Sequence, residues 1–366
     1  MGCLIFIPAA TFKSYGIFLT GLFTIGFGFT FLQIAANPLV LITGNPETGA
    51  SRLNLAGGFN SLATAVAPLI GVLVFYELLQ VKENPANLKY PYIFLTLFFV
   101  LLAFMIWKFL KIKEDDITVH DSGGKLFALN HLNLIFGMLA IFFYVGSEVT
   151  IGTNLVSFLS DPLTVNLQES VAGKLLAFYW GGAMIGRFLG SVALSDSKAV
   201  KKLVLMVLIS IALTAFLVYS IGNVELKLVY YVAFQALAII LLLACKSSAR
   251  MNLVLFSLVN IANLIVAMMM ANTMFAAWAI LSIGIFNSVM WPNIFDLGIA
   301  NLGKYKEQGS SLLVMMILGG ALLPLVQGYI ADIGNIVDSY WVPVFGYAYI
   351  LCYGLFYSQR KLNWIK

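Results

Sequence analysis

The chain has 366 residues, of which 61% are hydrophobic and only 10% are charged. A soluble globular domain carries roughly 25% charged residues, so this composition excludes an ordinary water-soluble protein. The net charge of +5 comes from Lys and Arg near the ends of apolar runs, and we therefore infer no nucleic-acid partner from it.

Apolar runs of about 20 residues recur along the whole chain, which is the length a helix needs to cross a bilayer. The runs show no period-two alternation, so we expect helices and not the strands of a barrel. The sequence thus predicts an all-α polytopic membrane protein with about eleven transmembrane helices. The expected spans are 14–42, 53–79, 91–110, 131–158, 172–195, 201–221, 226–245, 251–271, 273–298, 309–331 and 341–358.

One long polar connection divides the chain. It reads KIKEDDITVHDSGGK, from Lys111 to Lys125, and its charges and glycines are typical of a solvated linker. We expect a partial N-terminal helical bundle over 1–110, a cytoplasmic linker over 111–130 and a C-terminal helical bundle over 131–366.

Basic residues near span ends predict the orientation, since cytoplasmic connections carry an excess of Lys and Arg. The alternate connections that we assign to the cytoplasm hold Arg52, Lys108, Lys111, Lys113, Lys125, Lys198, Lys201, Lys202, Lys246, Arg250, Lys304, Lys306, Arg360, Lys361 and Lys366. The C-terminus is then cytoplasmic and the N-terminus lies outside. The first apolar stretch, GCLIFIPAA, is too short to span. We expect it to be the end of a helix whose beginning is missing, and the alternative is a short interfacial segment.

The residue types that enzymes need are scarce. The three cysteines are far apart and lack a metal or redox spacing, and both histidines lie in or beside the linker. The chain contains no catalytic triad pattern, phosphate-binding loop or dinucleotide fingerprint. We predict no enzyme activity, no cofactor and no bound metal.

Polar side chains inside the first two spans are candidates for a ligand site. Thr30, Gln33 and Asn37 follow one helical stripe, and Asn37 precedes Pro38, which removes a backbone hydrogen bond. Asn60 adds a second amide on the next span, beside a stripe of small residues that allows helices to approach closely. These amides either line a cavity or bond between helices, and we favour the cavity.

The fourth predicted span carries FYVGSEVTIGTNLVSFL. Ser147, Thr150, Asn154 and Ser157 share one face, and Glu148 lies beside that face. A carboxylate at this depth is costly unless it faces an interior pathway or a partner. We therefore interpret Glu148 as a candidate for reversible protonation, with a permanently paired structural acid as the alternative.

The ninth span carries GIFNSVMWPNIFDLGIANLG. Trp291 could stack on the apolar face of a ligand or simply pack, and Pro292 is expected to break the helix. Asp296 is interpreted as an interfacial or gating charge. In GGAMIGRFLGS, which we place at the cytoplasmic edge of the fifth span, Arg187 is interpreted as a structural latch.

Several of these stretches together resemble one transporter family. LQIAANPLV, SRLNLAGGFNSL, YVGSEVTIGTNLVSFL, GAMIGRFLGS and the long run from GIFNSVMWPNIF to LLPLVQGYIADIG resemble, in order, the fucose/glucose–galactose permeases of the major facilitator superfamily. That resemblance implies two six-helix halves and proton-coupled sugar uptake by alternating access. On that framework GCLIFIPAA resembles the end of helix three, so an N-terminal truncation is expected, and residues of about 201–247 are an inserted helix pair.

The resemblance is closer to the glucose/galactose branch, because fucose permeases have a glutamate where this chain has Gln33. Asn60 matches a sugar-contacting asparagine of the family. We expect Gln33, Asn37, Asn60, Asn154 and Trp291 to contact a hexose, and Glu148 to couple its movement to a proton or sodium ion.

The expected setting is the bacterial inner membrane, with a chain that is monomeric and surrounded by lipid. Two alternatives stay open. One is a non-transporting remnant of such a permease, and the other is a permease for another small sugar such as L-fucose.

Overall fold

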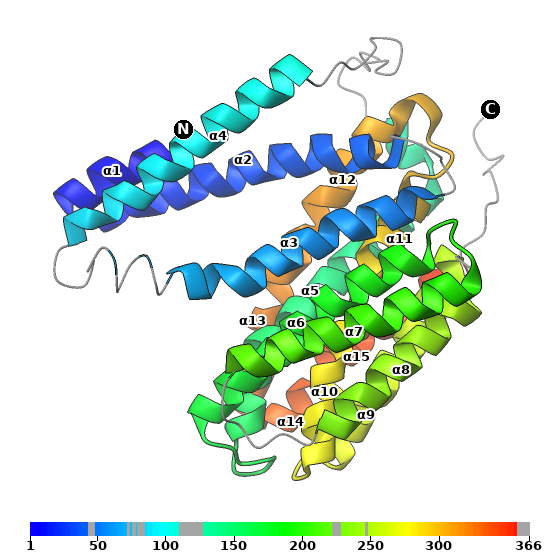
Figure 1. Ribbon diagram of the computed structural model, residues 1–366. Helices are drawn as coiled ribbons and strands as arrows, with labels where there is room; N and C mark the ends of the chain where they lie inside the picture. The colour runs from blue at the N-terminus through cyan, green and yellow to red at the C-terminus, as the bar shows by residue number, and fades with distance from the viewer. Residues whose placement is uncertain are drawn as a thin grey trace. The chain divides into compact units, whose positions relative to one another are not determined.

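The computed structural model describes residues 1–42, 48–71, 85–109, 127–221, 228–245 and 248–356, together with positions 74 and 78. Every regular element in this part of the chain is a helix (Figure 1). The α-helices are α1 (Gly2–Phe12), α2 (Tyr15–Ile42), α3 (Gly49–Gly71), α4 (Lys89–Phe109), α5 (Leu132–Ser160), α6 (Glu169–Ala193), α7 (Ala199–Ile221), α8 (Leu228–Ala244), α9 (Ala249–Met269), α10 (Met274–Asn287), α11 (Met290–Ile299), α12 (Lys306–Met315), α13 (Gly319–Ile333), α14 (Ile336–Ser339) and α15 (Trp341–Phe356).

The all-α prediction is confirmed. Each of the eleven predicted spans overlaps one helix or consecutive helices, and the described ends agree within a few residues. The span ends at 72–79, 110, 226–227 and 357–358 lie mostly outside the described residues. Within the described part, eight helical segments are long and apolar enough to cross a membrane. Residues 111–126 of the predicted linker 111–130 and the C-terminal tail, which hold some of the basic residues behind the predicted orientation, also lie outside the described residues.

Two predicted spans are interrupted helices. The ninth is divided into α10 and α11 at Ser288 and Val289. Pro292 has no N–H, so the Ser288 carbonyl loses its partner in the next turn, which accounts for the break. The tenth passes from α12 through a 3-10 turn, Met316–Leu318, into α13.

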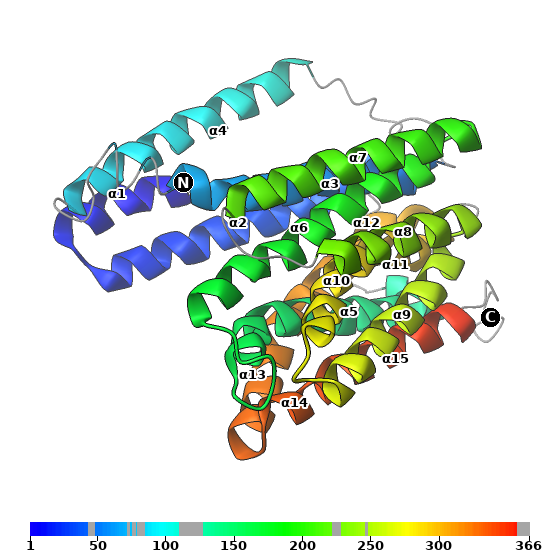
Figure 2. The ribbon, with the colours of Figure 1, turned by 60° about the horizontal axis from the view of Figure 1, so that its bottom comes forward.

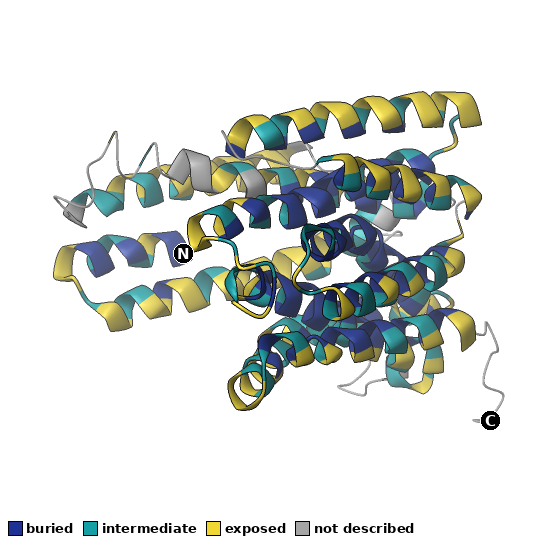
Figure 3. Cartoon of the chain, turned by 90° about the horizontal axis from the view of Figure 1, so that it is seen from below, coloured by how far each residue is buried: buried dark blue, intermediate teal, exposed yellow. Residues whose placement is uncertain are grey.

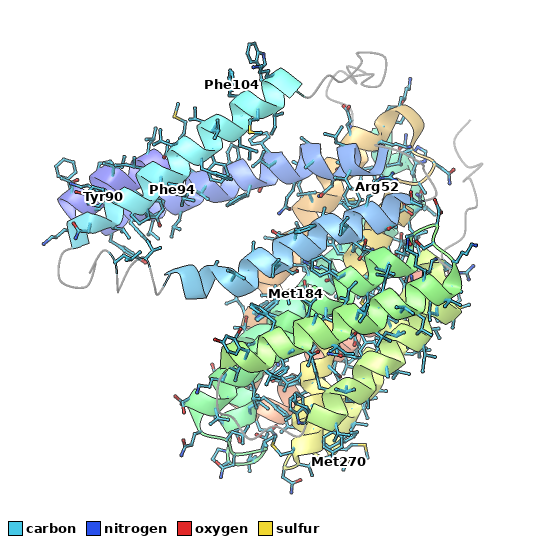
Figure 4. The ribbon with its side chains drawn as sticks, viewed as in Figure 1. Arg52, Tyr90, Phe94, Phe104, Met184 and Met270 are labelled. Carbon is cyan, nitrogen blue, oxygen red and sulfur yellow. The ribbon has the colours of Figure 1, made fainter. Side chains whose placement is uncertain are left out.

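The chain forms two compact units. The first comprises Met1–Ala36 and Thr64–Gly124, in which α1 packs on α4. Phe6 stacks on Tyr92 with ring centroids 3.9 Å apart. Helix α4 presents a largely apolar and exposed surface, from which Phe94 and Phe104 project (Figure 4). A surface of this kind is what lipid-facing helices need.

The second unit comprises Asn37–Ala63 and Lys125–Lys366 and contains most of the buried residues (Figure 3). Helix α5 packs against α13 and α15, while α6 packs against α10. The helices are close because small residues lie at the crossings: a side chain at Gly284 would clash with the Tyr179 carbonyl, and one at Gly319 with the Phe142 carbonyl.

The two helices of the predicted insertion, α7 and α8, belong to this second unit (Figure 2). Helix α7 contacts α6, and α8 contacts α10. Gln235 on α8 donates a hydrogen bond to Thr214 on α7, 2.7 Å away, and the Tyr231 hydroxyl donates to the Phe178 carbonyl of α6 at 3.0 Å. The pair is therefore anchored by polar contacts as well as apolar ones.

Candidate functional site

Glu148 is buried in the middle of α5, where polar groups from α5 and α6 reach it. The Tyr144 hydroxyl, one turn earlier on α5, donates a hydrogen bond of 2.9 Å to Glu148 Oε1. Arg187 Nη2 on α6 lies 3.9 Å from the same oxygen. The side chains of Arg187 and Glu148 are only 17% and 11% exposed, so this ion pair is largely removed from solvent.

Arg187 also contacts α3 within the same unit. Its Nη1 donates to Ser61 Oγ at 2.5 Å and to the Gly57 carbonyl at 3.2 Å. One turn after Arg187 on α6, the Ser191 carbonyl accepts a hydrogen bond of 2.6 Å from Ser51 Oγ of α3. Gly57 and Ser61, two members of the small-residue stripe predicted on α3, thus face α6. Arg187 is both a link between helices and the counter-ion of Glu148.

A hydrogen-bonded network continues from Glu148 into the bundle. The Tyr179 hydroxyl donates to the Glu148 carbonyl at 2.8 Å and accepts from Asn287 Nδ2 at 3.2 Å. Asn287 Oδ1 in turn accepts from the Tyr347 hydroxyl at 2.7 Å and from Asn260 Nδ2 at 3.0 Å. The network joins α5, α6, α9, α10 and α15, and all four residues beyond Glu148 are fully buried.

The polar stripe of α5 faces the helices of its own bundle. Ser147 and Thr150 are buried, and Ser147 Oγ lies 3.5 Å from the Pro343 carbonyl at the start of α15. Asn154 is half-buried and donates to the Thr150 carbonyl and to Gln327 Oε1 on α13, each at 3.1 Å. Both amide hydrogens of Asn154 are thereby engaged, so a ligand would meet its carbonyl oxygen.

The predicted sugar ligands are held by different elements. Gln33 is exposed on the part of α2 that belongs to the first unit. In the second unit, Asn37 is half-buried near the end of α2 and Asn60 is exposed on α3. Trp291 on α11 is half-buried and stacks on Phe295, with ring centroids 4.9 Å apart. One of its faces is therefore already covered.

The polar residues of the opening helices also include Arg52, at the beginning of α3 (Figure 4). Its guanidinium donates to the Val40 carbonyl at 3.0 Å and to Thr48 Oγ1 at 2.7 Å. Arg52 therefore connects the end of α2 to the start of α3, and its role is structural.

Sequence reasoning missed the tyrosines around Glu148. Tyr144, Tyr179 and Tyr347 occur in apolar runs, where a tyrosine is indistinguishable from an ordinary core aromatic. Only Tyr144 had a usable signal, because it precedes Glu148 by four residues and so lies on the same helical face.

Comparison with known proteins decides the family. No protein-family model matches the chain. A glucose/galactose transporter of Brucella abortus is 37% identical over 368 residues, which cover 98% of this chain and 76% of that protein. The chain belongs to the fucose/glucose–galactose permease family. The Escherichia coli L-fucose-proton symporter is 28% identical over 99% of the chain and 77% of its own length. The closer branch is therefore the one predicted from the sequence.

The fold agrees with this assignment. A crystal structure of the Escherichia coli fucose:proton symporter superposes with a TM-score of 0.74 at 25% identity, covering 98% of this chain and 81% of that one. A second structure, described as a major facilitator transporter in the outward conformation, gives 0.73. The chain thus has the major facilitator fold, and its relatives are membrane transporters of sugars.

Proposed function

We propose that this permease carries a glucose- or galactose-type hexose across the bacterial inner membrane together with a proton. The observation that supports the sugar is the 37% identity, across nearly the whole chain, to a protein named glucose/galactose transporter. The proton is supported by a relative named as a proton symporter and by the buried acid Glu148.

The sugar would be recognised by hydrogen bonds. Gln33, Asn37, Asn60 and Asn154 offer amide donors or acceptors. The face of Trp291 that does not stack on Phe295 would offer a surface for the apolar side of a pyranose ring. An amide left without its hydroxyl partner in a dry site is costly, so such a set discriminates between sugars that differ in one hydroxyl.

Glu148 would carry the proton. It is close enough to Arg187 to be stabilised when ionised, and a protonated carboxyl there would be a neutral group in an apolar bundle. For coupling, the empty carrier and the sugar-loaded carrier must differ in their affinity for the proton, because a ligand shifts only an equilibrium whose two states it binds differently.

The test is uptake by a bacterium that lacks its own hexose carriers. Labelled glucose, galactose and L-fucose are offered separately, with and without a protonophore, after the protein has been detected in the membrane. We expect glucose or galactose to enter and the protonophore to abolish accumulation. If only L-fucose enters, the substrate is L-fucose and not glucose or galactose. Failure of all three sugars to enter would contradict the proposal.

A further inference from the structure

Arg187 contacts two sets of partners through different nitrogens of its guanidinium, Nη1 and Nη2. Nη1 donates to Ser61 Oγ and to the Gly57 carbonyl of α3, at 2.5 and 3.2 Å. Nη2 lies 3.9 Å from the Glu148 carboxylate of α5. The first two are hydrogen bonds, whereas 3.9 Å is longer than the roughly 2.7–2.9 Å of a charge-assisted hydrogen bond. In this structure the shorter contacts of the guanidinium are therefore those to α3.

The fit of Arg187 against α3 depends on small residues. A methyl group at Gly57 would lie 3.3 Å from Arg187 Cδ, tighter than an ordinary contact, so a glycine leaves the room that the side chain occupies. Gly58 similarly admits the ring of Phe188, whose nearest atoms would lie 3.2 Å from an added methyl group. The surface of α3 is thus shaped to receive this part of α6.

The charge of Glu148 has one strong determinant among its neighbours. The titratable groups that surround it are Tyr144 on its own helix, Arg187 and Tyr179 on α6, and Tyr347 on α15. The three phenols are neutral near pH 7, while a guanidinium stays charged. Any movement of Arg187 therefore changes how readily Glu148 ionises.

We propose that Arg187 is a positioning residue that links the protonation of Glu148 to the docking of α3 on α6. When α3 is docked, Ser61 and Gly57 restrain the guanidinium and Glu148 binds a proton more readily. When α3 separates, the guanidinium closes on Glu148, stabilises the carboxylate and drives proton release. The converse must also hold, because such coupling is reciprocal. Once Glu148 is protonated it no longer attracts the guanidinium, so Arg187 binds α3 more strongly and docking is favoured.

This inference rests on the proposed function for its physiological meaning, but its first test uses no sugar. The purified protein is titrated by infrared spectroscopy, and the Glu148 carboxyl band is assigned from the difference between wild type and Glu148→Gln. Closing the ion pair from 3.9 Å to about 2.8 Å, at an effective dielectric constant of about 20, lowers the proton affinity of Glu148 by about tenfold. Ser61→Ala should therefore move the midpoint of the band about one pH unit lower.

The matched control is Ser51→Ala. Ser51 and Ser61 are both buried serines of α3, and both hydrogen-bond to α6, but Ser51 binds the Ser191 carbonyl and not Arg187. We expect its midpoint to equal that of the wild type. If the two serine variants titrate alike, or if Ser61→Ala moves the midpoint upward, the inference is overturned. Ser61→Cys, similar in size but a weaker acceptor, is the reserve variant should the alanine variant not fold.

Docking is measured by the distance between two spin labels in a background free of native cysteines. The labelled positions are exposed: Leu55→Cys on α3, and Lys198→Cys directly before α7, the helix that packs on α6. Raising the pH through the Glu148 midpoint should shift the population towards the longer distance, and Glu148→Gln should keep it at the shorter one. Arg187→Gln should remove the pH dependence. If the distance distribution of the labelled protein with Glu148 and Arg187 intact does not change with pH, the link between protonation and docking is refuted, even if sugar uptake is normal.

Discussion

Asn287 is the centre of the buried network, and its replacement by leucine tests whether the network stabilises the fold. The change keeps the side-chain size but leaves the Tyr347 hydroxyl and Asn260 Nδ2 without their shared acceptor, and removes a donor to Tyr179. Three hydrogen bonds at the average of about 0.6 kcal/mol measured between membrane helices give a cost of about 2 kcal/mol. Orphaned groups in a water-soluble protein would cost more, but an unfolded chain in lipid finds other partners.

The control is Asn252→Leu on α9. Asn252 is as deeply buried as Asn287, yet neither its Nδ2 nor its Oδ1 has a hydrogen-bond partner among the residues that the structure describes. Replacing an unpartnered amide by an apolar group of similar shape should be neutral or stabilising. Reversible unfolding in mixed micelles with increasing dodecyl sulfate measures both variants. Equal losses of unfolding free energy would refute the reasoning, because they would show that burial and not bonding decides the cost.

Three further outcomes follow from the same geometry. Tyr144→Phe removes the hydrogen bond to Glu148 that favours the ionised form, so Glu148 should stay protonated to higher pH, and the pH profile of uptake should move upward by about one unit; an unchanged profile would count against that bond. Gly284→Ala should sharply lower the yield of folded protein, because the added methyl group clashes with a backbone carbonyl of α6, whereas Gly173→Ala, with open space around it, should be tolerated. Asn60→Ala should raise the KM for sugar about tenfold with kcat little changed, as for a lost uniform hydrogen bond, and an unaltered KM would remove Asn60 from the sugar site.

The positions of the helices could be predicted because each apolar run is long and its ends are polar. The expected spans 131–158 and 172–195 correspond to α5, Leu132–Ser160, and α6, Glu169–Ala193. The break within the ninth span could also be expected, since Pro292 removes one rung of the hydrogen-bond ladder. Local chemistry is sufficient for predictions of this kind.

The partners of Glu148 could not be predicted in the same way. Arg187 lies on the next helix, and hydropathy carries no information about which faces of two helices meet. The sequence indicated Arg187 as a latch and Glu148 as a separate proton carrier, and the two roles meet only once α5 and α6 are packed together. The same limit applies to Asn154, whose bond to Gln327 depends on the packing of α13 against α5.

The measurement that tests the central claim most directly is sugar accumulation by proteoliposomes under an imposed pH gradient, with wild type compared with Glu148→Gln. The account predicts that wild type accumulates glucose or galactose above equilibrium, whereas Glu148→Gln exchanges the sugar across the membrane but no longer accumulates it. Accumulation by Glu148→Gln equal to that of wild type would contradict the assignment of Glu148 as the proton carrier.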